Sequence, residues 1–420
     1  VLASGSMNGN FIIQDPFGST GLLADLLIKE FAVMDVLLGR LSLEAEAIGS
    51  DRYNIDLAIK EGPANLDLTG SYVATPETAN LDMQLDLNEI KMAVVEGFIP
   101  EVLNSTSGSF SGRILVNGTT ANPEYDGSIH FNRAGFTVAA LDAPFLLPDE
   151  TVRLDDEGFY LTNFKILDAN ENAFVIDGSV NTEELLNPAF DLSFEAENFT
   201  ALSSTEEDFD LFYGKAIFDA TGSLTGDLEL PIIELELDVE EDTDMTYVIP
   251  EATLEVEQRE GVVVFVNREN PDRILTQTSE NQESLSFSGF QLNSYISVQE
   301  NATFKIILDE ETGDNFQASG EGDILFDIFP NGRTTMSGRF EIKDGHYEMS
   351  LYNLVTRRFD IMEGSSVVWA GDPLDADLNI TAVYEVEASA SALMAPQLTS
   401  ADLDVKDRYR QELPFLVYLN

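Results

Sequence analysis

The chain has 420 residues, 76 acidic and 22 basic, so its formal net charge at pH 7 is −54. Such a charge repels nucleic acid and anionic head groups, so we expect no nucleic-acid partner, and any lipid must be met by apolar surface. The hydrophobic content of 44% excludes a disordered acidic tail. The absence of cysteine excludes thiol catalysis, disulfides and cysteine-bound zinc.

The first strong feature in chain order is the apolar stretch 21–39. Asp25, Lys29, Glu30 and Asp35 interrupt it, so it is too charged to span a bilayer. We therefore expect any membrane anchor to lie outside these 420 residues.

Most of the remaining chain alternates between apolar and polar residues with period two. This pattern predicts half-buried strands that have one apolar face and one strongly acidic face. It occurs at 52–60, 80–90, 190–199, 226–242 and 302–310. Within 226–242 the alternation shifts by one at Pro231, which predicts a bulge or bend within one half-buried strand.

Helices are expected at only three places. Residues 89–105 have helical apolar spacing that Pro100 must kink or end. Residues 203–212 begin with a capping box from Ser204 to Glu207, which predicts a short helix. Residues 400–412 are expected to form a short helix or a flexible crossing.

An internal repeat organises the chain. Gly70 and Gly178 stand in similar segments 108 positions apart, and Pro123 and Pro231 have the same separation. A period of this length indicates modules of several strands rather than small solenoid coils. The expected modules are a partial N-terminal β-module at 1–69, repeat modules at 70–177 and 178–300, and a C-terminal β-module at 301–420 that is truncated at 420.

These elements predict an all-β fold with a few short helices. A long sheet with one apolar face must cover that face, and the predicted helices are too few to do so. The sheet therefore either forms sandwiches or curls into an elongated, taco-like trough with an apolar groove.

Two segments resemble a known family. The glycine, glycine and proline spacing at 112–123 resembles the AsmA-like superfamily of bacterial envelope proteins. Residues 322–390 resemble the C-terminal domain of the TamB (translocation and assembly module B) family. Their Gly-Asp-Pro form and acidic balance are most similar to versions from the Bacteroidetes lineage. The matching positions are Gly338, Gly345, Tyr347, Phe359, Ile361, Gly364, Trp369, Gly371, Pro373 and Ala382.

The resemblance implies a protein of the Gram-negative periplasm, anchored in the inner membrane and reaching the outer membrane. It implies a parallel, taco-shaped sheet whose C-terminal end pairs with an outer-membrane barrel of the Omp85 class, called TamA or TamL. The implied roles are transport of phospholipids, through their acyl chains, and assembly or secretion of outer-membrane proteins. It implies no enzymatic activity and no cofactor.

Polar clusters offer few candidates for chemistry. Asp372, Asp375 and Asp377 lack the frame of a calcium loop, so we expect a turn at Pro373 and no metal site. Two histidines, His130 and His346, are expected on strand surfaces and not in a catalytic or zinc site. The basic pair Arg357 and Arg358 is expected to be solvated, with pairing to acids or contact with a lipid phosphate at the groove mouth as alternatives.

The apolar faces are the remaining candidate site. They form either a closed core or the lining of an open lipid groove, and periodicity does not separate these cases. The lining residues that we expect are Ile114, Val116, Leu228, Leu230, Leu235, Leu237, Val239, Phe359, Ile361, Leu378, Ile380 and Ala382. The leading hypothesis is a phospholipid bridge. The alternatives are a scaffold for outer-membrane β-proteins and an acidic, adhesin-like β-sandwich array.

Overall fold

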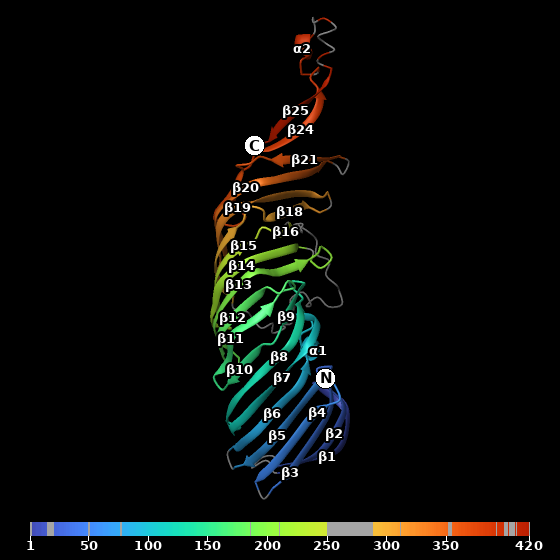
Figure 1. Ribbon diagram of the computed structural model, residues 1–420, viewed down its shortest axis with the longest axis vertical. Helices are drawn as coiled ribbons and strands as arrows, with labels where there is room; N and C mark the ends of the chain where they lie inside the picture. The colour runs from blue at the N-terminus through green and yellow to red at the C-terminus, as the bar shows by residue number, and fades with distance from the viewer. Residues whose placement is uncertain are drawn as a thin grey trace, which may run out of the picture.

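The strands lie across the long axis of an elongated molecule (Figure 1), and 25 of them belong to one sheet. This is a computed structural model. It describes residues 2–14, 21–48, 51–75, 78–184, 186–209, 211–249, 289–310, 312–351, 355–391, 393–398, 402, 408 and 410–419.

The first eight strands form an antiparallel meander in chain order. They are β1 (Ala3–Gln14), β2 (Gly21–Val33), β3 (Val36–Ala47), β4 (Arg52–Lys60), β5 (Ala64–Ala74), β6 (Ala79–Lys91), β7 (Leu103–Thr119) and β8 (Asn122–Val138). Alternation at 52–60 and 80–90 therefore predicted β4 and β6 correctly, because one face of each strand is apolar and the other polar.

In the middle of the sheet, two short strands lie end to end between the same two neighbouring strands. Both β9 (Ala143–Leu147) and β10 (Thr151–Asp155) lie between β8 and β11 (Gly158–Leu167). The meander then continues through β12 (Ala173–Asn181), β13 (Ala189–Ser204) and β14 (Phe212–Asp227). The strand predicted at 190–199 is the centre of β13.

Two parallel pairings follow. Both β15 (Pro231–Val239) and β16 (Asp244–Val248) pair with β14, and β17 (Gln291–Val298) and β18 (Thr303–Asp309) run parallel to β15 and β16. Strands β17 and β18 then pair antiparallel with β19 (Asp314–Ile328). The strand predicted at 302–310 is β18.

The C-terminal strands are antiparallel again and end in a two-stranded ribbon of β24 and β25. They are β20 (Thr334–Leu351), β21 (Val355–Ile361), β22 (Ser366–Gly371), β23 (Ala376–Asn379), β24 (Ala382–Ser389) and β25 (Glu412–Leu419). The parallel sheet implied by the family resemblance is therefore wrong for this chain. Short turns join most successive strands, and a short turn can only connect antiparallel neighbours.

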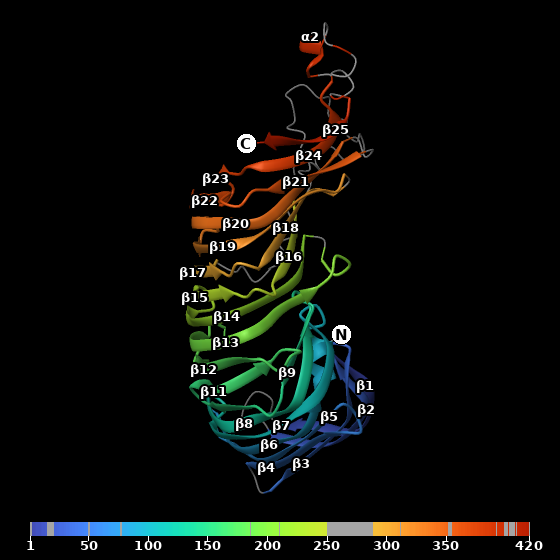
Figure 2. The same ribbon diagram turned by 45° about the horizontal axis from the view of Figure 1, so that its top comes forward.

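The sheet is curled, as expected for the trough. Helix α1 (Met92–Phe98) contacts β3 on one side and β7 and β8 on the other. In a flat sheet β3 and β8 would lie about 24 Å apart, whereas a helix is only about 10–12 Å wide. The strands must therefore wrap around α1, and Figure 2 shows them doing so at the N-terminal end of the molecule. One continuous sheet also makes the β-sandwich alternative wrong.

The helix predictions are only partly confirmed. Within 89–105, α1 occupies the centre and ends before Pro100, while the first three residues belong to β6. The helix at 203–212 is wrong: the Thr205 N–H and hydroxyl both bond the Asp208 carboxylate, which closes a single turn before β14. A second short helix, α2 (Ala395–Leu398), was not predicted. Most of 400–412 lies outside the described residues.

The bulge or bend predicted within one strand at Pro231 is a hairpin turn between two strands instead. Strand β14 ends at Asp227, Pro231 opens β15, and Gly226 faces Pro231 across the hairpin with a φ of 87°. The Asp227 carboxylate accepts a hydrogen bond from the Leu230 N–H at 2.9 Å, which closes the turn. The same hairpin occurs 108 residues earlier, where Gly118 with a φ of 81° faces Pro123.

Candidate functional site

The pairing register between neighbouring strands places their apolar side chains on one face of the sheet. Ile114 faces Leu85 on one neighbouring strand and Gly127 on the other. Leu237 faces Ala220 and Ile296 in the same way. Because α1 packs its apolar residues against this face, it is the concave side of the curled sheet. We call it the inner face.

The inner face carries one unbroken band of apolar contacts. Four clusters of buried residues lie along it, and neighbouring clusters share or adjoin the same side chains. Phe110 packs against both N-terminal clusters, and Phe136 packs against the second of these and the central one. Leu237 then contacts the central cluster, and Val239 on the same strand contacts the C-terminal one.

Phenylalanines form the centre of this band. The rings of Phe145 and Phe199 stack with their centroids 5.6 Å apart, and Phe174 lies 5.5 Å from Phe199. Phe174 in turn stacks on Phe194 at 5.4 Å. Aromatic rings therefore follow one another from β9 to β13, and such pairs are worth about 0.5–1.5 kcal/mol each beyond the area that they bury.

Most large side chains of the band are only half-buried. Among the described residues, Ile342 is the one large apolar side chain that is less than 2% exposed. Ile114, Leu235 and Leu237 are each half-buried. A closed core buries such side chains almost completely, so the inner face is a lined trough rather than a sealed interior.

The expected lining residues fall into three groups. Nine lie on the inner face, and five of these, Leu235, Leu237, Val239, Ile361 and Ile380, belong to the clusters of the band. Ile114, Val116, Leu235, Leu237, Val239 and Ile380 are half-buried, and Phe359, Ile361 and Ala382 are buried. Leu378 faces Val367 on the inner face but is 67% exposed, because among the described strands β23 pairs only with β22. Leu228 and Leu230 were placed wrongly: they lie in the β14–β15 turn and are 38% and 40% exposed.

Several lining residues were not among those expected from the sequence. Leu57 and Leu85 on the N-terminal strands follow from the same alternation that predicted β4 and β6. Phe199 does not, because a bulge between Ala196 and Phe199 changes which side chains point inward. Val94 of α1 could not be predicted as a lining residue without knowing that the helix packs inside the trough.

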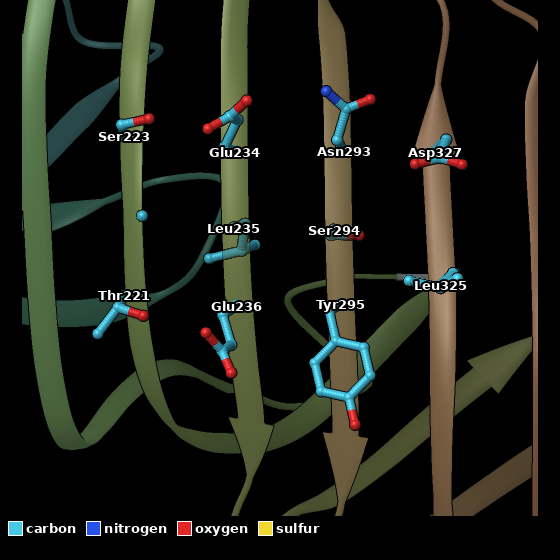
Figure 3. Close-up of a pocket in the computed structure, with 11 residues that line it drawn as sticks. Thr221, Ser223, Glu234, Leu235, Glu236, Asn293, Ser294, Tyr295, Leu325 and Asp327 are labelled. Atoms are coloured by element: carbon cyan, nitrogen blue, oxygen red, sulfur yellow. The ribbon is translucent and has the colours of Figure 1, made fainter.

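The opposite face, which we call the outer face, is acidic and shallow. In Figure 3, Glu234, Glu236, Asn293 and Tyr295 project from this face of neighbouring strands. They line a hollow of about 500 Å³ together with Asp327. Its acidic side chains repel anions, so the hollow does not suit a phosphate or an anionic head group.

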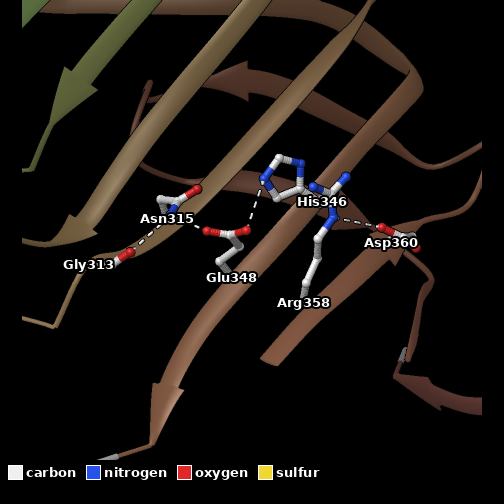
Figure 4. Close-up of polar contacts among 6 residues, drawn as sticks. All are labelled: Gly313, Asn315, His346, Glu348, Arg358 and Asp360. Atoms are coloured by element: carbon white, nitrogen blue, oxygen red, sulfur yellow. Dashed lines mark hydrogen bonds and ion pairs between the residues drawn. The ribbon is translucent and has the colours of Figure 1, made fainter. Parts of the chain in front are cut away.

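The histidines lie on the outer face, as expected. Figure 4 shows His346 beside Glu348, with an Nε2 to Oε1 distance of 3.8 Å, and Arg358 bonded to Asp360 at 3.1 Å. Burial and the nearby Arg358 cation lower the pKa of His346, so it is neutral at pH 7. His130 contacts Asp149 at 2.9 Å and lies on another part of the sheet.

The aspartate cluster forms the expected turn. Asp372 accepts hydrogen bonds from the Leu374 N–H at its carboxylate and from the Asp375 N–H at its carbonyl. The Trp369 indole N–H donates to the Pro373 carbonyl at 3.2 Å and fixes the same turn. Within the described part of the chain, no three His, Asp or Glu side chains are grouped so as to hold a metal ion.

The strand expected after this turn is broken in two. Leu378 belongs to β23, which pairs with β22, whereas Ala382 and Tyr384 belong to β24, which pairs with β21 and β25. The Thr381 N–H between them bonds the Ser365 hydroxyl at 3.1 Å. The apolar positions nevertheless stay on the inner face across the break.

Comparison with known protein families supports the resemblance that residues 322–390 indicated. The family model of the TamB C-terminal domain matches residues 162–420, which is more than half of the chain. No curated protein and no solved structure matches the chain. None of the helices in the described ranges is long and apolar enough to cross a membrane.

The match covers β12 to β25, the strands that carry part of the central cluster and the whole C-terminal cluster of the apolar band. The family belongs to the bacterial envelope, is not known for enzymatic activity, and has a role in outer-membrane protein assembly or lipid transport. On this match, the chain belongs to the TamB family.

Proposed function

We propose that the protein conducts phospholipids between the two membranes of the envelope along the inner face of its sheet. The observation that carries the proposal is the unbroken apolar band, which extends from Phe31 near α1 to Ile380 near the C-terminal end. Acyl chains lie against the band, and head groups remain in water at the open seam. In this proposal the protein is anchored in the inner membrane and works with an outer-membrane barrel of the Omp85 class.

The energetics favour acyl chains on the inner face and exclude them from the outer one. Each methylene fully removed from water gains about 0.8 kcal/mol, so ten methylenes that are half covered by the inner face gain about 4 kcal/mol. No charged anchor is needed for binding of that strength. On the outer face, carboxylates such as Glu234 and Glu236 would lose hydration if a chain covered them.

Photo-crosslinking in cells tests the proposal. Neighbouring residues of one strand point to opposite faces, so each inner position has a matched outer control one residue away. A photoreactive residue at Leu237 or Ile380 is expected to capture phospholipid, and one at Glu236 or Asn379 is not. Equal capture at both members of each pair would contradict conduction along the inner face.

A second candidate function, a scaffold for outer-membrane β-proteins, is favoured by β25. Among the described strands, β25 pairs only with β24. Leu413, Leu416, Val417 and Tyr418 on it are all more than 40% exposed. An open apolar edge can add a strand from another protein.

Two variants separate these functions. Leu237→Arg places a charge in the band and is expected to disturb the lipid balance of the outer membrane first. Leu416→Pro removes a backbone donor from β25 and is expected to disturb barrel assembly first. If Leu237→Arg left lipid balance normal and impaired only barrel assembly, the scaffold function would be the main one.

A further inference from the structure

We infer that Arg357 and Tyr384 form a subsite for the phosphate of a phospholipid head group at the C-terminal end of the apolar band. This inference rests on the proposed function. The two adjacent arginines of this region point to opposite faces of β21. Arg358 is on the outer face, where it bonds Asp360 at 3.1 Å, and Arg357 shares the inner face with Phe359 and Ile361.

Arg357 has uncharged neighbours on the inner face. It faces Met349 across the β20–β21 pair, and the rings near it belong to Phe359 and Tyr384. Among the described residues no carboxylate lies within 4.0 Å of its guanidinium, although the chain has 76 acidic residues. Arg113 on the outer face pairs with Asp86, whereas no such ion pair with a described residue is formed by Arg357.

Contacts with Tyr384 hold the guanidinium in place. One Nη1 donor of Arg357 bonds the Tyr384 hydroxyl oxygen, and the guanidinium carbon lies 5.2 Å from the centre of the Tyr384 ring. The Phe359 ring also packs against the Tyr384 ring, with centroids 5.4 Å apart. Cation–π contact and one hydrogen bond thus orient the arginine without neutralising it.

The remaining donors suit a phosphate. A guanidinium has five N–H donors in a fixed fork that matches two phosphate oxygens, and one is already used. Because the Tyr384 oxygen accepts from Arg357, its own O–H is left to donate to a phosphate oxygen. The Arg357 side chain is exposed, so a phosphate can reach it.

The aromatic wall gives the acyl chains a place beside the subsite. Tyr347 stacks on Phe359 at 6.3 Å, and Phe359 is buried against Tyr384. A lipid with its phosphate on Arg357 would lay its chains along this wall toward Ile361. The subsite therefore selects a phosphate-bearing lipid where the band ends, at the junction of β21 with the β24–β25 ribbon (Figure 1).

The test compares two lipids that differ only in the head group. Pyrene-labelled phosphatidylglycerol and pyrene-labelled diacylglycerol with the same acyl chains are titrated into the purified protein. Arg357→Gln is expected to weaken phosphatidylglycerol binding about tenfold, the effect of losing about 1.4 kcal/mol, and to leave diacylglycerol binding unchanged. Arg358→Gln is the matched control and should change neither, whereas Arg357→Lys should recover part of the loss.

The outcomes separate the subsite from the proposed function. Binding of both lipids by the wild type, with equal loss or no loss for the two in Arg357→Gln, would overturn the subsite and leave lipid conduction standing. Failure of the wild type to bind either lipid would overturn both. Both arginines are exposed, and circular dichroism melts equal to wild type would show that each variant is folded.

Discussion

Asp168 should be a strong determinant of local stability, because it ties the β11–β12 turn to β13. The residue is 4% exposed, and its carboxylate accepts backbone N–H bonds from Asn170 at 2.8 Å, Asn172 at 2.9 Å and Thr200 at 2.9 Å. The Asn172 side-chain amide adds a fourth bond at 3.2 Å. Burial acts to raise the pKa of Asp168, but these bonds outweigh it and the pKa is lowered.

Two substitutions of Asp168 should lower the local stability by different amounts. Asp168→Ala leaves the Thr200 N–H, on a residue that is 7% exposed, without an acceptor. An unsatisfied buried donor costs about 1–3 kcal/mol and bonds to a charged group contribute about 1.5–3 kcal/mol, so we expect a loss of about 3 kcal/mol. Asp168→Asn keeps one oxygen for Asn170 and Asn172 but sets an amide NH₂ against Thr200, for a loss of about 2 kcal/mol.

Hydrogen exchange measures this local effect directly, because an elongated sheet opens region by region. A loss of about 3 kcal/mol should speed exchange of the Thr200 amide about a hundredfold in Asp168→Ala. Exchange in β3, far along the sheet, is the internal control and should not change. Equal protection of Thr200 in wild type and variant would refute the reasoning.

The lowered pKa also sets the pH dependence. A carboxyl group whose pKa is lower in the folded state stabilises the protein above its unfolded pKa of about 3.9. That contribution is lost as the pH falls through the folded-state pKa of Asp168. The Thr200 amide of wild type should therefore lose protection in strong acid, and Asp168→Ala should show a smaller pH dependence there.

Three further changes test the packing. Phe199→Ala in the central aromatic cluster should cost about 3–5 kcal/mol, measured by the same exchange method on β13. Gly178→Ala should destabilise the β12–β13 pair by about 1–3 kcal/mol, because at a φ of 130° its Cβ would lie 2.1 Å from the Asp191 carbonyl oxygen. Burial, and then repulsion from Asp219, raises the pKa of Glu240, so Glu240→Gln should raise the melting temperature at pH 7. That gain should shrink as the pH falls and wild-type Glu240 becomes protonated.

Local alternation was enough to predict strands and faces, but not where a strand ends. The residues of β4 and β6 alternate because each strand is half-buried, and that pattern is local. Leu228 and Leu230 continue the alternation through a turn, where exposed leucines are indistinguishable by pattern from buried ones. The turn depends on Gly226 and on a bond to the Asp227 carboxylate, which periodicity does not report.

The curl and the centre of the site depend on contacts between distant residues. Val94 reaches the cluster that contains Val36 and Leu38 only because the sheet folds around α1. Phe199 points inward only because a bulge precedes it. Neither contact leaves a signal in its own stretch of sequence. The inner face could therefore be predicted from alternation, but the residues that pack at its centre could not.

The acidic outer face prevents the sheet from being covered on both sides. A second sheet packed on that face would have to bury carboxylates such as Glu234, Glu236 and Asp327, at several kcal/mol for each ion that lacks a partner. The inner face has no such penalty, but the described helices α1 and α2 are too short to cover it. Curling lets the apolar residues cover one another partly while the carboxylates stay in water. The same charge pattern that keeps the outer face solvated therefore leaves a half-covered apolar trough, which is the feature that acyl chains require.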